Sequence, residues 1–376
     1  MSSLAIGTAV GGATLGEGVV HVEMANGTRA TLHVLALRDA CACAECRHSV
    51  SGQRLFESLQ VLPGARAEAV RVSDAGLLEI DWADGHRSSY RPEWIEAEVS
   101  AAENGRRPAR RVRPWGGDLP EHRWSDVAND DGARTVWLRD VAEFGFAVLH
   151  GVPCEPGFVE RVATLFGAVR ETNYGRVFDV SVAVDATNLA DTALPLSPHT
   201  DNPYRDPTPT VQLLHCLASD VEGGSTVLVD GFAAAGRLRD EAPDGFELLA
   251  RTPIRFAYRD GDADLEADTP VVTCDADGNV VALHLNNRSK GIPSGDAAHV
   301  AAWYDAYLAL LALIESPELQ LVFRLEPGDL IVFDNLRLLH GRTGFAGEGT
   351  RLLQGCYADR DALLSTLAVL SRTEEG

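Results

Sequence analysis

The chain has 376 residues, more than one average domain needs, and its 45% hydrophobic and 23% charged residues are typical of a globular protein with a sizeable core. Its 55 acidic and 33 basic residues give a formal net charge of −22, which argues against nucleic-acid binding through a broad basic surface. No run reaches the roughly 20 apolar residues of a membrane span, and residues 1–20 lack the basic flank of a secretory signal. We therefore expect a cytoplasmic protein with neither membrane nor nucleic acid as a partner.

Residues 1–105 are predicted to form a small β-rich domain. Short runs there alternate apolar and polar residues, and Gly and Asp turns separate them. We expect strands within 30–39, 68–74 and 77–95. The run NGRRPARRVRPW, residues 104–115, crowds Pro, Gly and Arg together, which indicates a solvated linker over 106–117.

Residues 118–376 are predicted to form a second, larger domain. The patterns of 135–153 and 155–167 indicate a helix, a strand and a second helix. Seven β segments follow, interrupted by a long helical pattern over 296–316. Many strands with Gly and Pro turns and few helices favour a sandwich or jelly roll, so the fold class is expected to be mainly β. The β segments are residues 210–217, 224–232, 253–258, 279–287, 319–325, 329–335 and 351–357.

The motif SPHTDNPY, residues 197–204, places His199 and Asp201 two positions apart. Alternate residues of an extended strand share a face, so both side chains would point the same way and form half of a metal site. The best candidate for a third ligand is His340. Two histidines and one carboxylate make a facial triad with three open positions on Fe(II), whereas zinc hydrolases usually keep one. Each signal alone is weak, because H-x-D pairs often occur by chance and a lone histidine is more often a core residue.

Arg351 follows His340 by eleven residues and opens the next predicted strand. A guanidinium there can clamp a carboxylate through two hydrogen bonds, and a co-substrate that chelates iron needs its far end anchored. The spacing fits 2-oxoglutarate, although an isolated arginine is more often part of a surface ion pair. The order His-x-Asp, His, Arg in a β-rich frame predicts an Fe(II)/2-oxoglutarate oxygenase.

Three of the seven cysteines, Cys41, Cys43 and Cys46, fall within six residues and need a fourth ligand for tetrahedral zinc. His48 is very close to them in sequence. His86 is preferred, because it follows a turn-like ADG segment that a small sheet could fold back over the cysteines. Four protein ligands leave no position for water, so this zinc is expected to be structural. The alternative is three reduced thiols without a metal.

Five segments resemble the γ-butyrobetaine hydroxylase family, which includes the trimethyllysine hydroxylases. They are LRDACACAECRHSVSGQRLF, DWADGHRSSY, HTDNPYRDPTPTVQLLHC, DNLRLLHGRTGF and LQGCYADRD, and the likeness covers nearly the whole chain. The resemblance implies a double-stranded β-helix (jelly-roll) catalytic domain with flanking helices behind a small zinc-binding domain, commonly in a homodimer.

The same resemblance implies roles for individual residues. Asn188 occupies a co-substrate position of the family, although an asparagine that serves only a turn is an equally good interpretation. Ascorbate is a candidate reductant. The implied iron ligands are His199, Asp201 and His340; Arg351 and Thr226 would hold the distal carboxylate of 2-oxoglutarate; and the family pattern agrees with His86 as the zinc ligand.

A quaternary ammonium neither donates nor accepts hydrogen bonds, so its recognition depends on aromatic faces. Tyr174, Phe178 and Tyr357 match cage positions of the family, although each could equally be a core residue. Two positions depart from the pattern: Asp191 stands where the family carries another aromatic residue, and Phe178 where it carries tryptophan. Asn286 or Asn287 is expected to meet the anionic end of the substrate.

The leading hypothesis is hydroxylation of γ-butyrobetaine to carnitine, with O2 and 2-oxoglutarate consumed and succinate and CO2 released. Trimethyllysine or a trimethylammonioethylphosphonate-like compound is the alternative within the same chemistry. From a different class, a cupin-like metal isomerase or binding protein would not require Arg351 beside an open metal face.

Overall fold

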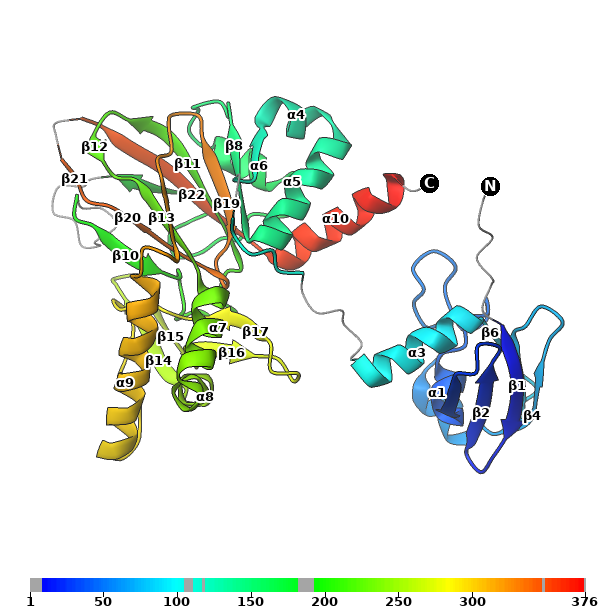
Figure 1. Cartoon of the computed structure of the whole chain (residues 1–376). Coiled ribbons are helices and arrows are strands. Elements are labelled where there is room, and N and C mark those ends of the chain that lie inside the picture. The colour runs from blue at the N-terminus through cyan, green and yellow to red at the C-terminus, as the bar shows by residue number, and fades with distance from the viewer. Residues whose placement is uncertain (1–8, 105–110, 117–118, 182–192, 347–348, 375–376) are drawn as a thin grey trace. The chain divides into compact units, whose positions relative to one another are not determined.

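The computed structural model describes residues 9–104, 111–116, 119–181, 193–346 and 349–374. The chain divides into two compact units, Met1–Ala109 and Arg110–Gly376, called here the N-terminal and C-terminal units (Figure 1). Each is described by itself.

The N-terminal unit contains two three-stranded antiparallel sheets that enclose one hydrophobic core. The core takes Val20 and Val22 from one sheet and Leu78, Ile80 and Trp82 from the other, in strict alternation along the strands. The first sheet is β1 (Val10–Leu15), β2 (Val19–Met24) and β3 (Arg29–His33); the second is β4 (Ala67–Val72), β5 (Leu78–Trp82) and β6 (Arg87–Tyr90).

Strand residues lie within both 30–39 and 77–95, as predicted, but each of these stretches ends in a helix that was not predicted. The stretch 30–39 leaves the sheet at His33, whose Nδ1 accepts a hydrogen bond from the backbone N–H of Leu35 and so caps α1 (Val34–Asp39). The stretch 77–95 ends in α3 (Pro92–Asn104), because proline at the first helical position lacks the N–H that a strand would pair. The remaining helical turns are α2 (Ser58–Val61) and η1 (Leu62–Gly64).

The C-terminal unit is built on two sheets whose strand orders cross over repeatedly, as in a jelly roll. Phe146, Ile331, Phe333 and Leu353 from the larger sheet pack with Leu228 from the smaller sheet in one core cluster. The larger sheet is β7 (Glu121–Arg123), β8 (Phe146–His150), β19 (Leu330–Asp334), β11 (Val211–Ser219), β22 (Arg351–Ala358) and β9 (Phe178–Ser181). The smaller is β10 (Leu196–His199), β20 (Leu338–Arg342), β13 (Thr226–Asp230) and β18 (Gln320–Phe323), and β12 (Glu222–Gly223) pairs with β21 (Phe345–Ala346).

Four helices pack with the larger sheet: α4 (Trp124–Asn129), α5 (Asp131–Phe144), α6 (Phe158–Ala163) and α10 (Arg360–Glu374). The larger sheet separates two cores, and the residues of β11 contribute to both. Val211 and Leu213 pack in the core on the side of the helices, and Leu214 and Cys216 pack in the core between the two sheets. The predicted order of helix, strand and helix is confirmed by α5, β8 and α6. Gly145 ends α5 in a left-handed conformation (φ 89°), where a Cβ would lie 3.1 Å from the Arg337 side chain.

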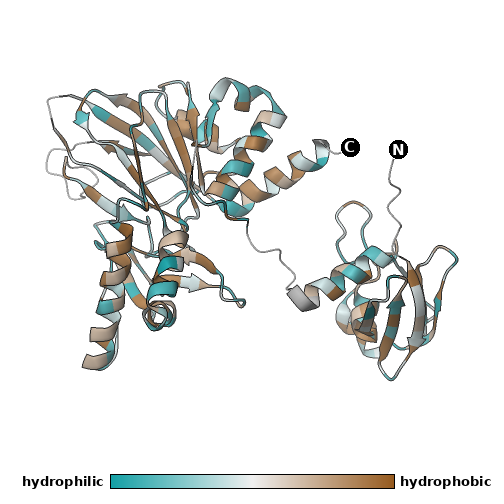
Figure 2. Ribbon diagram, in the orientation of Figure 1, coloured by the Kyte–Doolittle hydropathy of each residue, from teal (hydrophilic) through white to brown (hydrophobic). Residues whose placement is uncertain are grey.

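A second layer of helices surrounds a separate core. Helix α9 (Ala297–Ile314) confirms the helix predicted over 296–316. Among the described residues it is the one helix long and apolar enough to cross a membrane by length and composition alone; 28% of it is buried, and Trp303, Leu310 and Ile314 pack in the core. Figure 2 shows hydrophobic residues concentrated along the strands of the sheets. The other elements are α7 (Gly231–Glu241), α8 (Pro243–Arg251) and the hairpins β14 (Ile254–Arg259) with β15 (Asp264–Thr269) and β16 (Val272–Cys274) with β17 (Val280–Leu283).

Candidate active site

Two neighbouring strands and one turn bring three metal-binding side chains together. His199 ends β10 and lies directly opposite His340 of β20 in the antiparallel register, with their ring centroids 4.4 Å apart. The Asp201 carboxylate lies beside both rings, 3.3 Å from His199 Nε2 and 3.8 Å from His340 Nε2. The three ligand atoms lie within 4.8 Å of one another.

Asp201 reaches this position by a route that differs from the predicted one. Strand β10 ends at His199, so Asp201 lies in the turn beyond it, where Asn202 is left-handed at φ 54°. The side chain of Asn335 holds the turn: its Oδ1 accepts from the Asp201 N–H at 2.8 Å and its Nδ2 donates to the Asp201 carbonyl at 2.9 Å. Tertiary hydrogen bonds, and not strand alternation, place the two ligands together.

The protonation states suit a divalent metal, which binds a carboxylate and neutral imidazoles. Burial opposes ionisation of Asp201, but His340 and His199 outweigh it and hold the pKa of its carboxyl well below the usual range. Burial, together with the neighbouring His199 ring, lowers the pKa of His340 to about 3. His199 Nδ1 donates to the Ser197 carbonyl at 2.9 Å, which leaves Nε2 as the metal ligand. These three residues therefore fit a facial-triad Fe(II) site.

Two neutral donors occupy one oxygen of the Asp201 carboxylate. Tyr357 Oη and Gln212 Nε2 each donate to Oδ2 at 2.9 Å, which leaves Oδ1 for a metal. Tyr357 was predicted as a cage residue, and the structure adds this hydrogen bond to a ligand. Gln212 was missed, because a buried glutamine on an apolar strand carries no distinctive motif.

The triad lines a cavity of about 830 Å³, within the range of small-molecule sites. Arg351, the first residue of β22, and Thr226, the first of β13, line the same cavity. Arg351 is 9% exposed and forms no ion pair with any described residue; it donates to the Gly224 carbonyl at 3.4 Å. Gly224 is left-handed at φ 69°, and a Cβ there would lie 3.1 Å from Arg351 Nε. A buried cation without an acidic partner is costly, which favours an anionic ligand beside it.

Five aromatic residues on the cavity form what we call the aromatic wall. The ring of Phe178 stacks on Tyr357, with centroids 5.1 Å apart, and lies 6.2 Å from the ring of Tyr174. The structure extends the predicted set with Tyr204, whose hydroxyl lies 2.9 Å from that of Tyr174, and with Tyr258, which stacks on Tyr204 at 5.1 Å. Burial raises the pKa of Tyr204, Tyr258 and Tyr357, so these rings stay neutral. The wall consists of Tyr174, Phe178, Tyr204, Tyr258 and Tyr357.

Of the other residues predicted to contact substrate or co-substrate, only some line the cavity. Asn286 lines the cavity, but its Nδ2 donates to the Thr200 carbonyl and its Oδ1 accepts from the backbone N–H of Arg288. Asn287 is not among the residues lining the cavity, and its Oδ1 accepts from Tyr307 Oη at 2.6 Å. The predicted residues Asn188 and Asp191 lie outside the described residues.

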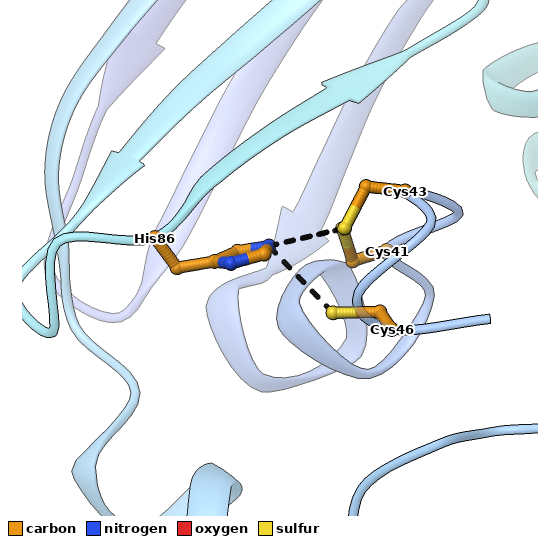
Figure 3. A group of neighbouring side chains, drawn as sticks. All are labelled: Cys41, Cys43, Cys46 and His86. Atoms are coloured by element: carbon orange, nitrogen blue, oxygen red, sulfur yellow. Dashed lines mark hydrogen bonds between the residues drawn. The ribbon is translucent and has the colours of Figure 1, made fainter.

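In the N-terminal unit, Cys41, Cys43 and Cys46 surround the ring of His86 (Figure 3). Their Sγ atoms lie 3.3, 3.7 and 3.6 Å from His86 Nε2. Tetrahedral zinc, with bonds of about 2.3 Å to sulfur and about 2.0 Å to nitrogen, would place these atoms about 3.5 Å apart. The geometry thus fits zinc and agrees with His86 in preference to His48.

The surroundings of this cluster add a residue that sequence reasoning missed. Buried Arg38 donates to Cys46 Sγ at 3.3 Å and to Asp84 at 3.3 Å. Burial raises the pKa of the Cys46 thiol to about 11 and the Arg38 hydrogen bond opposes that rise. The other ring nitrogen of His86, Nδ1, lies 3.5 Å from the carboxylate of Glu45. Metal-binding histidines commonly place their second ring nitrogen beside a carboxylate in this way.

Comparison with known proteins relates both units to characterised families. Residues 108–357 match the family described as taurine catabolism dioxygenase TauD, TfdA family, and residues 14–96 match the family described as gamma-butyrobetaine hydroxylase-like, N-terminal. A gamma-butyrobetaine dioxygenase of Pseudomonas sp. (strain AK-1) is 38% identical over 94% of both chains. A trimethyllysine dioxygenase of Meyerozyma guilliermondii is 30% identical over 94% of this chain and 93% of its own.

Among solved structures, an asparagine oxygenase in complex with Fe(II), 2S,3S-3-hydroxyasparagine and succinate has a TM-score of 0.49 at 20% identity, and covers 61% of this chain and 78% of its own. The family matches and the two relatives confirm the resemblance noted in the sequence, and with it an Fe(II)/2-oxoglutarate-dependent dioxygenase. The chain therefore belongs to the TauD/TfdA family of dioxygenases.

Proposed function

We propose that this dioxygenase hydroxylates an unactivated C–H bond of γ-butyrobetaine, with carnitine, succinate and CO2 as products. The main support for this proposal is that Phe178 stacks on Tyr357. The hydroxyl of Tyr357 donates a hydrogen bond to the metal ligand Asp201. An aromatic surface thus begins at the metal centre itself. Each ring face contributes about 0.5–2 kcal/mol to binding a quaternary ammonium, and no hydrogen-bonding partner is needed there.

Each group of cavity residues has a separate task in this proposal. His199, Asp201 and His340 hold Fe(II), which supplies the chemistry that activates O2 for C–H oxidation. Arg351 and Thr226 bind the distal carboxylate of 2-oxoglutarate. Tyr357 and Gln212 keep Asp201 in one orientation, and the aromatic wall positions the substrate and excludes water. Asn188 stays a predicted co-substrate ligand.

We further propose that Cys41, Cys43, Cys46 and His86 hold a structural zinc ion. Four donors complete a tetrahedral site and leave no position for a substrate. A homodimer, a cytoplasmic location and the use of ascorbate stay predictions.

Trimethyllysine is the second candidate substrate, because a trimethyllysine dioxygenase is also 30% identical over nearly the whole chain. Its additional amino group would have to be accommodated in the same cavity. A trimethylammonioethylphosphonate-like compound is the third candidate substrate.

The test is a panel of these three cations with purified protein, Fe(II), 2-oxoglutarate and O2. We expect succinate and carnitine in equal amounts from γ-butyrobetaine, measured by mass spectrometry. Succinate without carnitine, together with a hydroxylated product from another cation, would move the assignment to that cation. No O2-dependent succinate at all would favour a cupin-like isomerase or binding protein.

A further inference from the structure

Arg288, in the loop that follows β17, lines the same cavity as the metal ligands. Its backbone N–H donates to Asn286 Oδ1 at 3.1 Å, and Asn286 Nδ2 donates to the carbonyl of Thr200 at 3.1 Å. Thr200 stands between the ligands His199 and Asp201. The loop that carries Arg288 is therefore tied directly to the metal-binding turn.

The side chain of Arg288 forms no ion pair and no hydrogen bond with any residue in the described part of the chain, unlike the other arginines at this cavity. Arg259 pairs with Asp264 at 2.7 Å, Arg351 donates to the Gly224 carbonyl, and Arg342 donates to the Leu194 carbonyl. Arg288 is solvent-exposed at the cavity, and its guanidinium has no partner among the described residues, so its donors are free to meet a ligand. An unpaired guanidinium in a ligand cavity favours an anionic group of the ligand.

Arg288 and Arg351 have different neighbours. Arg288 lines the cavity together with Asp201, Tyr174 and Tyr204, the groups whose charges would act on it, so it lies near the metal ligand and near the Tyr174 end of the aromatic wall. Arg351 lies instead near Arg324 and near Cys216, whose thiol is neutral because burial raises its pKa to about 11. One cation can therefore serve 2-oxoglutarate while the other remains for the substrate.

We infer that Arg288 binds the carboxylate of the substrate and so restricts this enzyme to small zwitterions, with the quaternary ammonium on the aromatic wall. The inference rests on the proposed function and deepens it. The predicted contact of Asn286 or Asn287 with the anionic end stays a prediction. Asn286 Nδ2 donates to the Thr200 carbonyl and Asn287 Oδ1 accepts from Tyr307 Oη, whereas the guanidinium of Arg288 has no bond to a described residue. A guanidinium repels an ammonium, so the same residue fixes which end of the substrate enters first.

The test compares γ-butyrobetaine with its primary amide, which keeps the quaternary ammonium and replaces the carboxylate by a neutral carboxamide, in three proteins: wild type, Arg288→Met and Arg259→Met. Arg288→Met removes the charge, keeps an apolar stem and breaks no side-chain hydrogen bond in the described structure, so it should fold normally. Arg259→Met is the matched control, because it removes an arginine that already pairs with Asp264 at the same cavity. Binding is measured by anaerobic calorimetry on protein loaded with Fe(II) and 2-oxoglutarate, and turnover is measured separately.

We expect wild type to bind γ-butyrobetaine about 10- to 100-fold more tightly than the amide, as a charge-assisted hydrogen bond implies. Arg288→Met should abolish that preference and raise the KM for γ-butyrobetaine by the same factor, with the KM for 2-oxoglutarate unchanged. Arg259→Met should keep the preference. Equal wild-type affinity for the two ligands, or a preference that survives in Arg288→Met, would overturn the inference. A preference that depends on Arg288 without any hydroxylated product would overturn the proposed function and leave the binding assignment standing.

Discussion

The Cys41/Cys43/Cys46/His86 cluster of the N-terminal unit and the His199/Asp201/His340 cluster of the C-terminal unit differ in donor number and in access. The first gathers four donors around one point, and two of its thiols, Cys41 and Cys46, are buried. The second gathers three donors on the wall of a cavity of about 830 Å³. A tetrahedral zinc site is complete with four ligands, whereas three ligands leave a metal open to co-substrate and O2.

The groups around the two clusters differ in charge, and the reason lies in the ligands. Three thiolates exceed the charge of one Zn²⁺, and the cation of Arg38 beside Cys46 offsets that excess. One carboxylate does not exceed the charge of Fe(II), and the neutral donors Tyr357 and Gln212 suffice for it. Donor number, access and surrounding charge together distinguish the proposed structural zinc site from the proposed iron site.

The largest difference between the two clusters is expected from His199→Ala, which removes a ligand from the C-terminal cluster only. With two donors left the C-terminal cluster should lose Fe(II), so turnover should fall below detection while one zinc per chain remains. Metal content by elemental analysis and succinate release measure the two outcomes, with the exposed His21→Ala as control. Retained turnover would remove the iron assignment.

Cys41→Ser is expected to affect the other cluster, the one in the N-terminal unit. Zinc should be lost and the N-terminal unit should melt at a much lower temperature, because binding of structural zinc contributes directly to the free energy of folding. Calorimetric melting and zinc content test this, with the exposed Cys154→Ser as the matched control. An unchanged melting profile would mean that the thiols hold no metal.

Arg351→Ala should raise the KM for 2-oxoglutarate about 100-fold, because a charge-assisted, bidentate contact is lost. Arg351→Lys retains the charge without the planar fork and should fall between the two. Initial rates at varied 2-oxoglutarate provide the measurement. A KM that stays at the wild-type value would assign the co-substrate anchor to another cation.

Tyr357→Phe is the mildest change. It keeps the stack with Phe178 but removes the donor to Asp201 Oδ2, so the affinity for Fe(II) should fall about 10-fold. Activity titrated with Fe(II) shows the effect, and Tyr304→Phe, outside the cavity lining, is the control. If only the KM for the betaine changed, the hydrogen bond would have no role in holding the metal.

Sequence reasoning succeeded where a residue type carries its own chemistry or a long segment has one clear period. The long helix over 296–316 was predictable because its apolar pattern extends over several turns. Helices α7, α8 and α10 were missed although the sequence carries helix signals there: Asp230 caps α7 and Pro243 opens α8. Prediction also failed at element ends, as at His33, where a single capping hydrogen bond converts strand to helix.

The sequence by itself determined the donor set: two imidazoles and one carboxylate in one half, three thiols and one imidazole in the other. Ligand preference depends on side-chain type, which is local information. Only the tertiary structure decided that Asn335, 134 positions from Asp201, holds the metal-binding turn, and that Arg288 lines the cavity with no acidic partner among the described residues. Such roles depend on contacts between distant residues, and these exist only after the sheets have packed.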